Sequence, residues 1–379
     1  MLILLTDNHK SYRRSEKLRG SMRGNSIGRM FKITTFGESH GKVVGVVIDG
    51  CPPGVPLSES TINEALEKRR PNSSLASTAR QEADKGNIIS GLFNGYTTGA
   101  PLTVIIENSD VNKTEYEDIS GYFRPGHADY TYYHKYNGFN DPAGGGRSSG
   151  RETVCRVAAG AVAREVVNYG YLVSKCGQPS VIDLFAHTVQ IGAIKATNFN
   201  RDAIDSSALK CADKTAEQEM YKLIRECYSE GDSVGGVAEL RINGVPVGIG
   251  DPVFDKLDAR LAYAVMGIPA VKGVEIGDGF AAASVKGYEN NDGMADDHFL
   301  SNHAGGILGG ISNGQTIILR AAIKPTPSIR KTQRTVTKSG ANTDVSISGR
   351  HDVCIVPRIV PVIEAMAWIT LADFALISR

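Results

Sequence analysis

Four of the eight histidines in this chain lie in short loops where an imidazole could be held for proton transfer. His40, His127, His303 and His351 each stand close to glycine in a tight or charged segment. Near neutral pH a histidine can donate or accept a proton, so two of them in one pocket could serve two proton transfers. Ordinary packing is the alternative for each one taken singly. The other four are expected to be structural or solvated: His9, His134, His187 and His298.

Seven arginines stand beside similar turns, where their guanidinium groups could bind an anion. They are Arg69, Arg70, Arg80, Arg124, Arg147, Arg151 and Arg350. Exposed basic residues are usually solvated, and that alternative holds for each arginine alone. Because the arginines share their loops with the histidines, the whole set favours an anionic ligand with several charged oxygens. No metal-ligand spacing and no nucleophile elbow points to another chemistry.

The segment 144–152 places three consecutive glycines before Arg147, Ser148, Ser149 and Arg151, and a helical pattern follows it. Glycine lets backbone N–H groups approach a ligand closely, the first turn of a helix has unpaired donors, and arginine adds a fork of donors. The segment therefore predicts a phosphate-binding site. A flexible turn before a serine-capped helix is the alternative. The glycine spacing is that of neither the P-loop nor the dinucleotide fingerprint, so the common nucleotide folds are not expected.

The composition is that of a globular protein with one large core or two modest ones. The 379 residues carry 42 Lys and Arg against 41 Asp and Glu, and 41% are hydrophobic. A formal net charge of +1 argues against a general nucleic-acid binder. No apolar run is expected to reach the about 18 residues that span a membrane. The six scattered cysteines form no CxxC or Cys/His pattern, so we expect reduced thiols in a cytoplasmic protein and no metal site.

Periodicity and turn signals predict the elements that must position these loops. Strands are expected at 31–36, 43–48, 87–93, 102–107, 181–194 and 316–323, with a strand pair at 237–247. Helices are expected at 58–70, 153–167, 215–230, 251–266 and 359–376, the fourth with Asp251 as N-cap and Pro252 at its first position. The pattern indicates an α+β protein in which antiparallel β-sheets cover a helical layer. Residues 22–379 are expected to form one catalytic domain, and residues 1–21 a disordered N-terminal extension.

Eight motifs that follow one another along the chain resemble the chorismate synthase family, and together they cover it from Met22 to about Leu376. They lie at 24–28, 36–41, 124–130, 144–152, 231–236, 272–279, 301–312 and 349–352. Each motif alone is weak, whereas the ordered set is highly specific. The resemblance implies a carbon–oxygen lyase of the shikimate pathway, in which aromatic amino acids are made. Its reaction is the trans-1,4-elimination of phosphate from 5-enolpyruvylshikimate 3-phosphate to give chorismate, and it needs reduced FMN without net redox change.

The resemblance further implies a homotetramer with helices sandwiched between β-sheets, and a role for each matching residue. His40 matches the histidine that protonates the departing phosphate, and His127 the one beside the N1 side of the flavin. Asp352, with Ser39 and Ser148, matches the group that relays a proton at flavin N5. FMN contacts are expected from Arg147, Ser148, Ser149, Pro269, Ala270, Gly309, Lys324, Pro325, Thr326, Pro327, Ser328 and Arg350. The substrate is expected to bind near Arg69, Arg70, Arg80, Arg124 and Arg151.

Some points stay open from the sequence alone. A flavin oxidoreductase would consume one reductant per product, and a non-catalytic phospholigand-binding module would form no product. NADPH could serve as reductant, but the chain shows no recognisable nicotinamide fingerprint. Asn72 and Leu75 stand where the family pattern has glycine and a basic residue. Because leucine cannot donate to an anion, this loop is expected to bind the substrate or NADPH more weakly.

Overall fold

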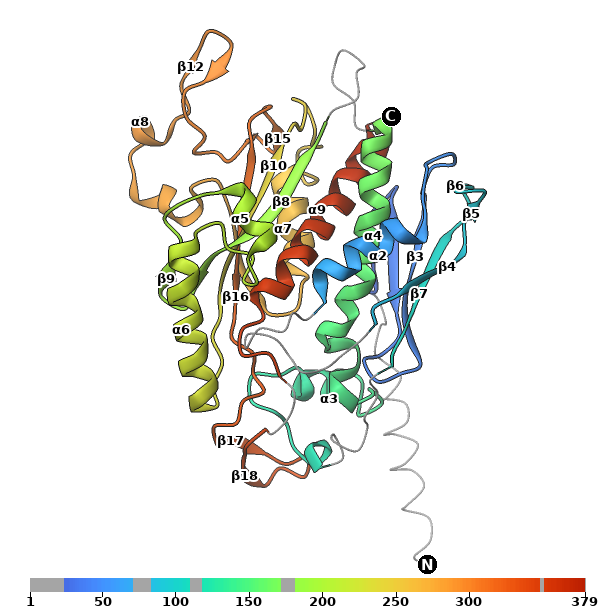
Figure 1. The fold of residues 1–379 in the computed structure, drawn as a ribbon, viewed down its shortest axis with the longest axis vertical. Helices are drawn as coiled ribbons and strands as arrows, with labels where there is room; N and C mark the ends of the chain where they lie inside the picture. The colour runs from blue at the N-terminus through green and yellow to red at the C-terminus, as the bar shows by residue number, and fades with distance from the viewer. Residues whose placement is uncertain (1–23, 71–82, 110–117, 172–180, 348–350, 379) are drawn as a thin grey trace, which may run out of the picture.

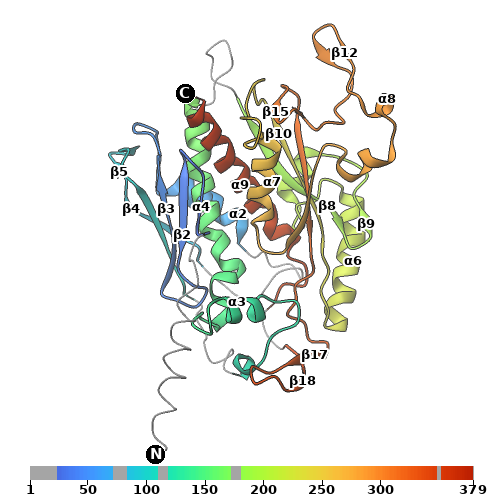
Figure 2. The same ribbon diagram turned by 180° about the vertical axis from the view of Figure 1, so that it is seen from behind.

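The computed structural model describes residues 24–70, 83–109, 118–171, 181–347 and 351–378. The expected extension 1–21 lies outside these residues, as do Arg80, Arg350, Asn72 and Leu75. Within the described part, a layer of helices lies between two five-stranded antiparallel sheets (Figures 1 and 2). The expected α+β architecture, with antiparallel sheets covering a helical layer, is therefore confirmed. The three helices between the sheets are α2 (Glu59–Arg69), α4 (Thr153–Val166) and α9 (Val356–Ile377).

The first sheet has the strand order β1-β2-β3-β7-β4. Its strands are β1 (Ser26–Ile27), β2 (Lys32–Phe36), β3 (Val43–Asp49), β4 (Gly86–Ser90) and β7 (Leu102–Glu107). Alternate residues of β3 and β7 face the helices, and Val46 pairs with Val104 across the ladder. Both side chains are fully buried. The period of two in the sequence thus selects the face that packs on α2 and α4.

The second sheet has the strand order β11-β16-β10-β8-β9. Its strands are β8 (Asp183–Ile191), β9 (Ile194–Lys195), β10 (Gly236–Asn243), β11 (Val271–Ile276) and β16 (Ile317–Ile323). Leu240 and Leu319 are paired and fully buried in the core. The next pair along the ladder, Glu239 and Arg320, faces the other side.

The two long helices at the centre contact each other closely. A Cβ atom on Gly160 of α4 would lie 2.5 Å from Cα of Ala365 in α9, so only glycine permits this approach. Helix α9 is apolar enough and long enough to cross a membrane, which corrects the expectation that no such run exists. Its apolar window is 89% buried inside the protein, so the helix forms the core between the sheets. One cluster of buried apolar side chains joins both sheets and all three helices, which favours a single domain.

Two expected elements are wrong in detail. The helix expected from residue 251 begins only at Leu257, with Lys256 as its N-cap residue, and ends at Met266 (α7). Asp251 does not cap it, because its backbone N–H donates to the carbonyl of Asp255 and closes a turn (3.0 Å). The strand pair expected at 237–247 is the single strand β10, which pairs with β8 and β16 from distant parts of the chain.

The remaining elements are short, apart from α6. They are β5 (Leu92–Phe93), β6 (Tyr96–Thr97), η2 (Asp118–Gly121), α3 (Asp129–Lys135), η3 (Ala143–Ser148), η4 (Gly150–Glu152), η5 (Val167–Tyr171), α5 (Arg201–Ser206), α6 (Lys214–Glu230), η6 (Gly279–Ser284), α8 (Gly287–Asn290), β12 (Met294–Ala295), β13 (His298–Phe299), β14 (Ile307–Leu308), β15 (Ile311–Ser312), β17 (Gln333–Val336) and β18 (Asn342–Val345). Helix α6, expected at 215–230, is capped by Asp213 and is followed by Gly231 in the left-handed region.

Candidate active site

A cavity of about 1400 Å³ lies where α4 and α9 begin. Its wall is formed by β2, the loops around α3, the glycine run, the segment after α7, residues 324–328 and the first turns of α4 and α9. The described lining residues include nine Lys and Arg against five Asp and Glu, so the cavity is positively charged. Apolar side chains line another part of it: Met266, Ile268, Val271, Ile355, Ile359, Val362 and Met366.

The three glycines of η3 have a backbone conformation and close neighbours that a larger residue could not accommodate. Gly144, Gly145 and Gly146 all have positive φ (59°, 88° and 53°). A Cβ atom on Gly144 would lie 2.2 Å from Nδ1 of His40, and one on Gly145 would lie 3.0 Å from Cε1 of His127. Glycine is therefore required here by backbone conformation and by space. The glycine run places the two expected histidines on either side of one short segment.

Two serines lie at the same place. The Ser39 hydroxyl oxygen would be 3.0 Å from a Cβ atom on Gly144, and that of Ser148 3.1 Å from one on Gly145. Ser148 Oγ donates to the Gly145 carbonyl (2.7 Å). Four of the five expected catalytic side chains thus gather around two consecutive glycines.

His127 is held by its neighbours in the loop. Its Nδ1 lies 2.7 Å from Asp129 Oδ1, and Arg124 donates to both oxygens of Asp129 from Nε and Nη2 (2.6 and 2.8 Å). Burial lowers the pKa of His127, although the hydrogen bond to Asp129 opposes this. Burial would raise the pKa of Asp129, but hydrogen bonds from Arg124 and His127 lower it well below its usual range. With Nδ1 bound to a carboxylate, Nε2 is the nitrogen left for proton exchange.

His40 lies just behind the cavity wall. It is 4% exposed and does not line the cavity itself, whereas Ser39 and Gly144 in front of it do. Its loop is tied down by Asn108, whose side-chain amide donates to the carbonyls of Glu38 and Gly41 (3.1 and 2.9 Å). The ring is therefore positioned by both the loop and the glycine run.

Asp352 lines the cavity from the segment before α9 and is 9% exposed. Arg358, in the first turn of α9, donates from Nη1 to Asp352 Oδ2 (2.7 Å) and also lines the cavity. Sequence reasoning missed Arg358. The available signal was that it is the one basic residue of α9, a mostly apolar helix.

Arg69 reaches the cavity wall with its donors already engaged. Its Nε donates to Thr153 Oγ1 (3.0 Å), Nη1 to Asp84 Oδ2 (3.2 Å) and Nη2 to the Gly150 carbonyl (2.7 Å). Burial lowers its pKa to about 10, with a further lowering from Arg358. Arg69 thus joins the end of α2 to the start of α4.

Arg151 is held in the same way and shares the buried carboxylate. Its Nη1 contacts Asp84 Oδ1, its Nε donates to Asn108 Oδ1 (2.8 Å) and its Nη2 donates to the Glu107 carbonyl (3.1 Å). Asp84 is 1% exposed. One buried carboxylate therefore fixes two of the expected substrate arginines, which leaves a fixed net positive charge beside the cavity.

The expected cofactor positions divide into two groups. Most line the cavity: Arg147, Ser148, Ser149, Pro269, Ala270, Lys324, Thr326, Pro327 and Ser328. Pro325 is exposed beside them, and Gly309 lies in the β14–β15 turn outside the lining. Among the expected substrate residues, Arg124 lines the cavity, whereas Arg70 does not and contacts the Ala83 carbonyl.

Lys324 and Ala270 connect the second sheet to the His127 loop. Lys324 Nζ donates to the Gly126 carbonyl (2.6 Å), and Lys324 N donates to the Ala270 carbonyl (2.9 Å). Ala270 has φ of 72°, a conformation that non-glycine residues adopt rarely and that is often found at functional sites. Of the two other candidate histidines, His351 lines the cavity, whereas His303 is bound to Asp278 (2.6 Å) outside the lining.

The residues present fit a phosphorylated aromatic cofactor. The basic side chains provide charge for a phosphate, and the apolar part of the wall suits a planar ring system. The volume leaves room for a second small anion beside it. Among the described residues, no group of three or more His, Cys, Asp or Glu side chains is placed to hold a metal ion.

An α+β fold with a cationic cavity and two histidines packed on one glycine run defines an enzyme that acts on a small polyanion. The family model for chorismate synthase matches residues 31–376. Chorismate synthase of Syntrophobacter fumaroxidans is 52% identical over 94% of this chain and 98% of its own, and that of Maridesulfovibrio salexigens is 51% identical over 94% and 99%. A crystal structure of chorismate synthase superposes with a TM-score of 0.70 at 29% identity, covering 92% of each chain.

The chain belongs to the chorismate synthase family. It is a carbon–oxygen lyase of the shikimate pathway, which converts 5-enolpyruvylshikimate 3-phosphate to chorismate. The family uses reduced FMN. The resemblance read from the eight motifs is confirmed, and with it the predicted reaction.

Proposed function

We propose that the elimination takes place in this cavity and that His40, His127 and Asp352 handle its protons. The observation that carries the proposal is the packing of Ser39, His40, His127 and Ser148 around Gly144 and Gly145. Side chains from three separate segments meet there beside a space of suitable size and charge. The division of roles among them follows the family resemblance.

The charge of the cavity supports loss of phosphate. Cleavage of the C–O bond places negative charge on the leaving group, and fixed positive charge lowers the barrier to that step. Protein acceptors hold the guanidinium groups of Arg69, Arg124 and Arg151 in place, so we propose that they act by position and field. Arg70 and Arg80 stay predictions as substrate ligands.

The two histidines differ in what they can do. His40, behind Ser39 and Gly144, is the proposed acid for the departing phosphate. Burial keeps His127 mainly neutral near pH 7, and its Nε2 is the proposed site of proton exchange beside the flavin. Arg358 holds Asp352 at the wall by its bond to Oδ2, and Asp352 is the proposed proton relay at the flavin.

The proposed cofactor site consists of the lining residues that match the family's FMN positions. These are Arg147, Ser148, Ser149, Pro269, Ala270, Lys324, Thr326, Pro327 and Ser328. When bound, reduced FMN supplies an electron-rich ring that assists cleavage of the C–O bond. Pro325, Gly309 and Arg350 stay predictions. Gly309 lies outside this cavity.

An anaerobic assay of phosphate and chorismate formation tests the proposal. Product should form only with reduced FMN, and no reductant should be consumed per turnover. One reductant per product would indicate a flavin oxidoreductase, and phospholigand binding without product would indicate a binding module. The matched pair His127→Ala and His187→Ala then decides whether this cavity carries the reaction.

NADPH as the reductant of bound FMN is a finer proposal. The cavity is large and cationic, which suits a second phosphorylated molecule. Anaerobic oxidation of NADPH by the enzyme with FMN would support it. If flavin becomes reduced only with dithionite or an external reductase, the chain does not use NADPH.

Assembly as a homotetramer is also a proposal. Phe254, Phe280 and Tyr288 expose 91%, 81% and 96% of their surface, and exposed large apolar side chains can mark an interface between chains. Light scattering of the purified protein would give the mass of four chains.

A cytoplasmic location is supported by the five described cysteines, which are all free thiols.

A further inference from the structure

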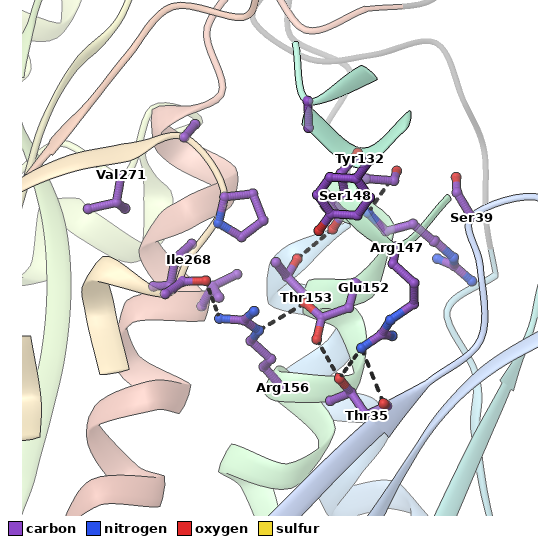
Figure 3. A pocket seen from close by; sticks show the side chains of 18 of the residues that line it. Thr35, Ser39, Tyr132, Arg147, Ser148, Glu152, Thr153, Arg156, Ile268 and Val271 are labelled. Atoms are coloured by element: carbon purple, nitrogen blue, oxygen red, sulfur yellow. Dashed lines mark hydrogen bonds and ion pairs between the residues drawn. The ribbon is translucent and has the colours of Figure 1, made fainter. Parts of the chain in front are cut away.

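Glu152 is a buried carboxylate in the wall of the cavity that has no role in the chemistry above. It lies in η4 directly before α4 and is 6% exposed. Its two oxygens are bound by residues from different walls: Oε1 accepts from the Thr35 hydroxyl (2.7 Å), and Oε2 accepts from Arg156 Nε (2.9 Å). Figure 3 shows both interactions, with Thr35 on one side of Glu152 and Arg156 on the other.

The hydrogen bond from Thr35 connects Glu152 to Arg147. Arg147 Nη2 donates to Thr35 Oγ1 (2.8 Å), and its Nη1 donates to the Gly37 carbonyl (3.2 Å). A hydroxyl has one hydrogen, which Thr35 gives to the carboxylate of Glu152, so its lone pairs remain for the guanidinium. The charge of Glu152 thereby orders the hydroxyl so that it accepts from Arg147 and fixes that side chain against β2.

The ion pair with Arg156 connects Glu152 to the segment after α7. Arg156 pairs with Glu152 and donates from Nη1 to the Gly267 carbonyl (2.8 Å). Gly267 stands at the start of the turn that contains Pro269 and Ala270, where Ala270 has positive φ. Without a counter-charge at Glu152, Arg156 would lose the partner that orients its guanidinium group toward the Gly267 carbonyl.

We infer that Glu152 is a positioning residue for the cofactor site, which sets the affinity for FMN by fixing Arg147 and the Gly267–Ala270 turn in one arrangement. The inference rests on the proposed FMN site, since it assumes that both groups contact the flavin. The physical reason is pre-organisation: groups held in the binding geometry before the ligand arrives lose less freedom on binding.

The test measures FMN binding by flavin fluorescence, together with the melting temperature of each variant. Glu152→Gln keeps the size of the side chain but removes its charge, and should raise the Kd for FMN about tenfold, as expected for loss of a charge-assisted hydrogen bond. Thr35→Val removes only the hydroxyl between Glu152 and Arg147, and should raise the Kd by a smaller factor. It also keeps the inference testable if Glu152→Gln fails to fold.

A matched control comes from α4, the helix that follows Glu152. Glu165 in α4 pairs with Arg164 (3.0 Å) and does not line the cavity, so Glu165→Gln should leave the Kd for FMN unchanged. In the double variant Arg147→Ala with Glu152→Gln, the effects on Kd should be non-additive, because both changes interrupt the same chain of hydrogen bonds from Glu152 through Thr35 to Arg147. A purely structural role would lower the melting temperature and leave the two effects additive.

The outcomes separate this inference from the proposed function. If Arg147→Ala weakens FMN binding while Glu152→Gln and Thr35→Val leave it unchanged, the positioning role is overturned and the cofactor site stands. If Arg147→Ala has no effect on the Kd, the proposed cofactor site fails and the inference fails with it.

Discussion

Two clusters in this molecule are built from the same kinds of side chain but differ in place. At the cavity, His127 lies 2.7 Å from Asp129, which Arg124 holds with two hydrogen bonds. On the face of the second sheet away from α9, His187 lies 3.9 Å from Glu239. Arg241 and Arg320 each donate to Glu239 from Nε (2.8 Å).

The two histidines differ in what surrounds their second nitrogen. His127 lines a ligand-sized cavity and is backed by Gly145, so a proton on Nε2 can be exchanged with a bound molecule. His187 is 3% exposed in a strand whose neighbours are fixed by the ladder, and it does not line the cavity. The proton exchange proposed for His127 depends on the space for a ligand beside it, which the similar cluster around His187 lacks. Elsewhere the same residues serve the packing of a sheet.

The largest difference between the two clusters should appear when each histidine is removed. His40→Ala and His127→Ala should each lower turnover by roughly 10²–10⁴-fold, as expected for loss of a general acid or base. His187→Ala should keep near-wild-type turnover at temperatures where it is folded. Chorismate formation with reduced FMN under anaerobic conditions measures all three. Wild-type turnover in either of the first two variants would remove that histidine from the mechanism.

The buried His187 should make the stability of the fold sensitive to acid. Burial lowers the pKa of His187 to about 4, so the unfolded chain binds a proton that the folded chain rejects. This difference in pKa contributes about 3 kcal/mol to the free energy of unfolding at pH values above about 6.5, the pKa in the unfolded chain. The contribution is lost as the pH falls toward 4. His187→Leu should flatten this part of the curve of unfolding free energy against pH. Urea titrations at pH 7, 5.5 and 4.5 would show it, and an unchanged slope would contradict the assignment.

The carboxylate partners sharpen the contrast. Asp129→Asn removes the charge that opposes the lowering of the His127 pKa, so that pKa should fall further and turnover should fall about tenfold. Glu239→Gln should instead lower the melting temperature and leave turnover unchanged, because its partners lie in the sheet. Activity against pH and thermal unfolding of both variants provide the comparison. Equal effects of the two changes on turnover would show that the clusters are coupled.

The smallest effect is expected from the N-terminal extension. Removal of residues 1–21 should leave flavin binding, turnover and solubility unchanged, because the family motifs and the expected domain begin at Met22. Size-exclusion chromatography and an FMN titration of the shortened chain would test this. A loss of either solubility or FMN affinity would show that the extension contributes to the protein.

Local signals predicted much of the fold. The strand expected at 102–107 is β7, and the helix expected at 153–167 is α4 within one residue. These elements have clear periods and end at turn residues. The helix expected from Asp251 shows where such signals fail: Asp251 with Pro252 resembles a helix start, but a backbone bond from Asp251 to Asp255 closes a turn instead. At the true start of α7, the Leu257 N–H donates to the Gly310 carbonyl (2.8 Å), a contact with a distant segment that a local pattern does not contain.

The sequence predicted many of the residues that belong to the candidate site, but not which of them contact one another. Most of the site residues that the resemblance named line the cavity, because residue types such as glycine, arginine and histidine at fixed spacing carry chemical information on their own. The sequence could not show that Gly144 and Gly145 face two different histidines, or that Asp84 binds both Arg69 and Arg151. Nor could it show that Glu152 joins two walls of the cavity. Those contacts connect residues far apart in the chain, and they exist only because two sheets pack against one helical layer and bring the loops to the same end.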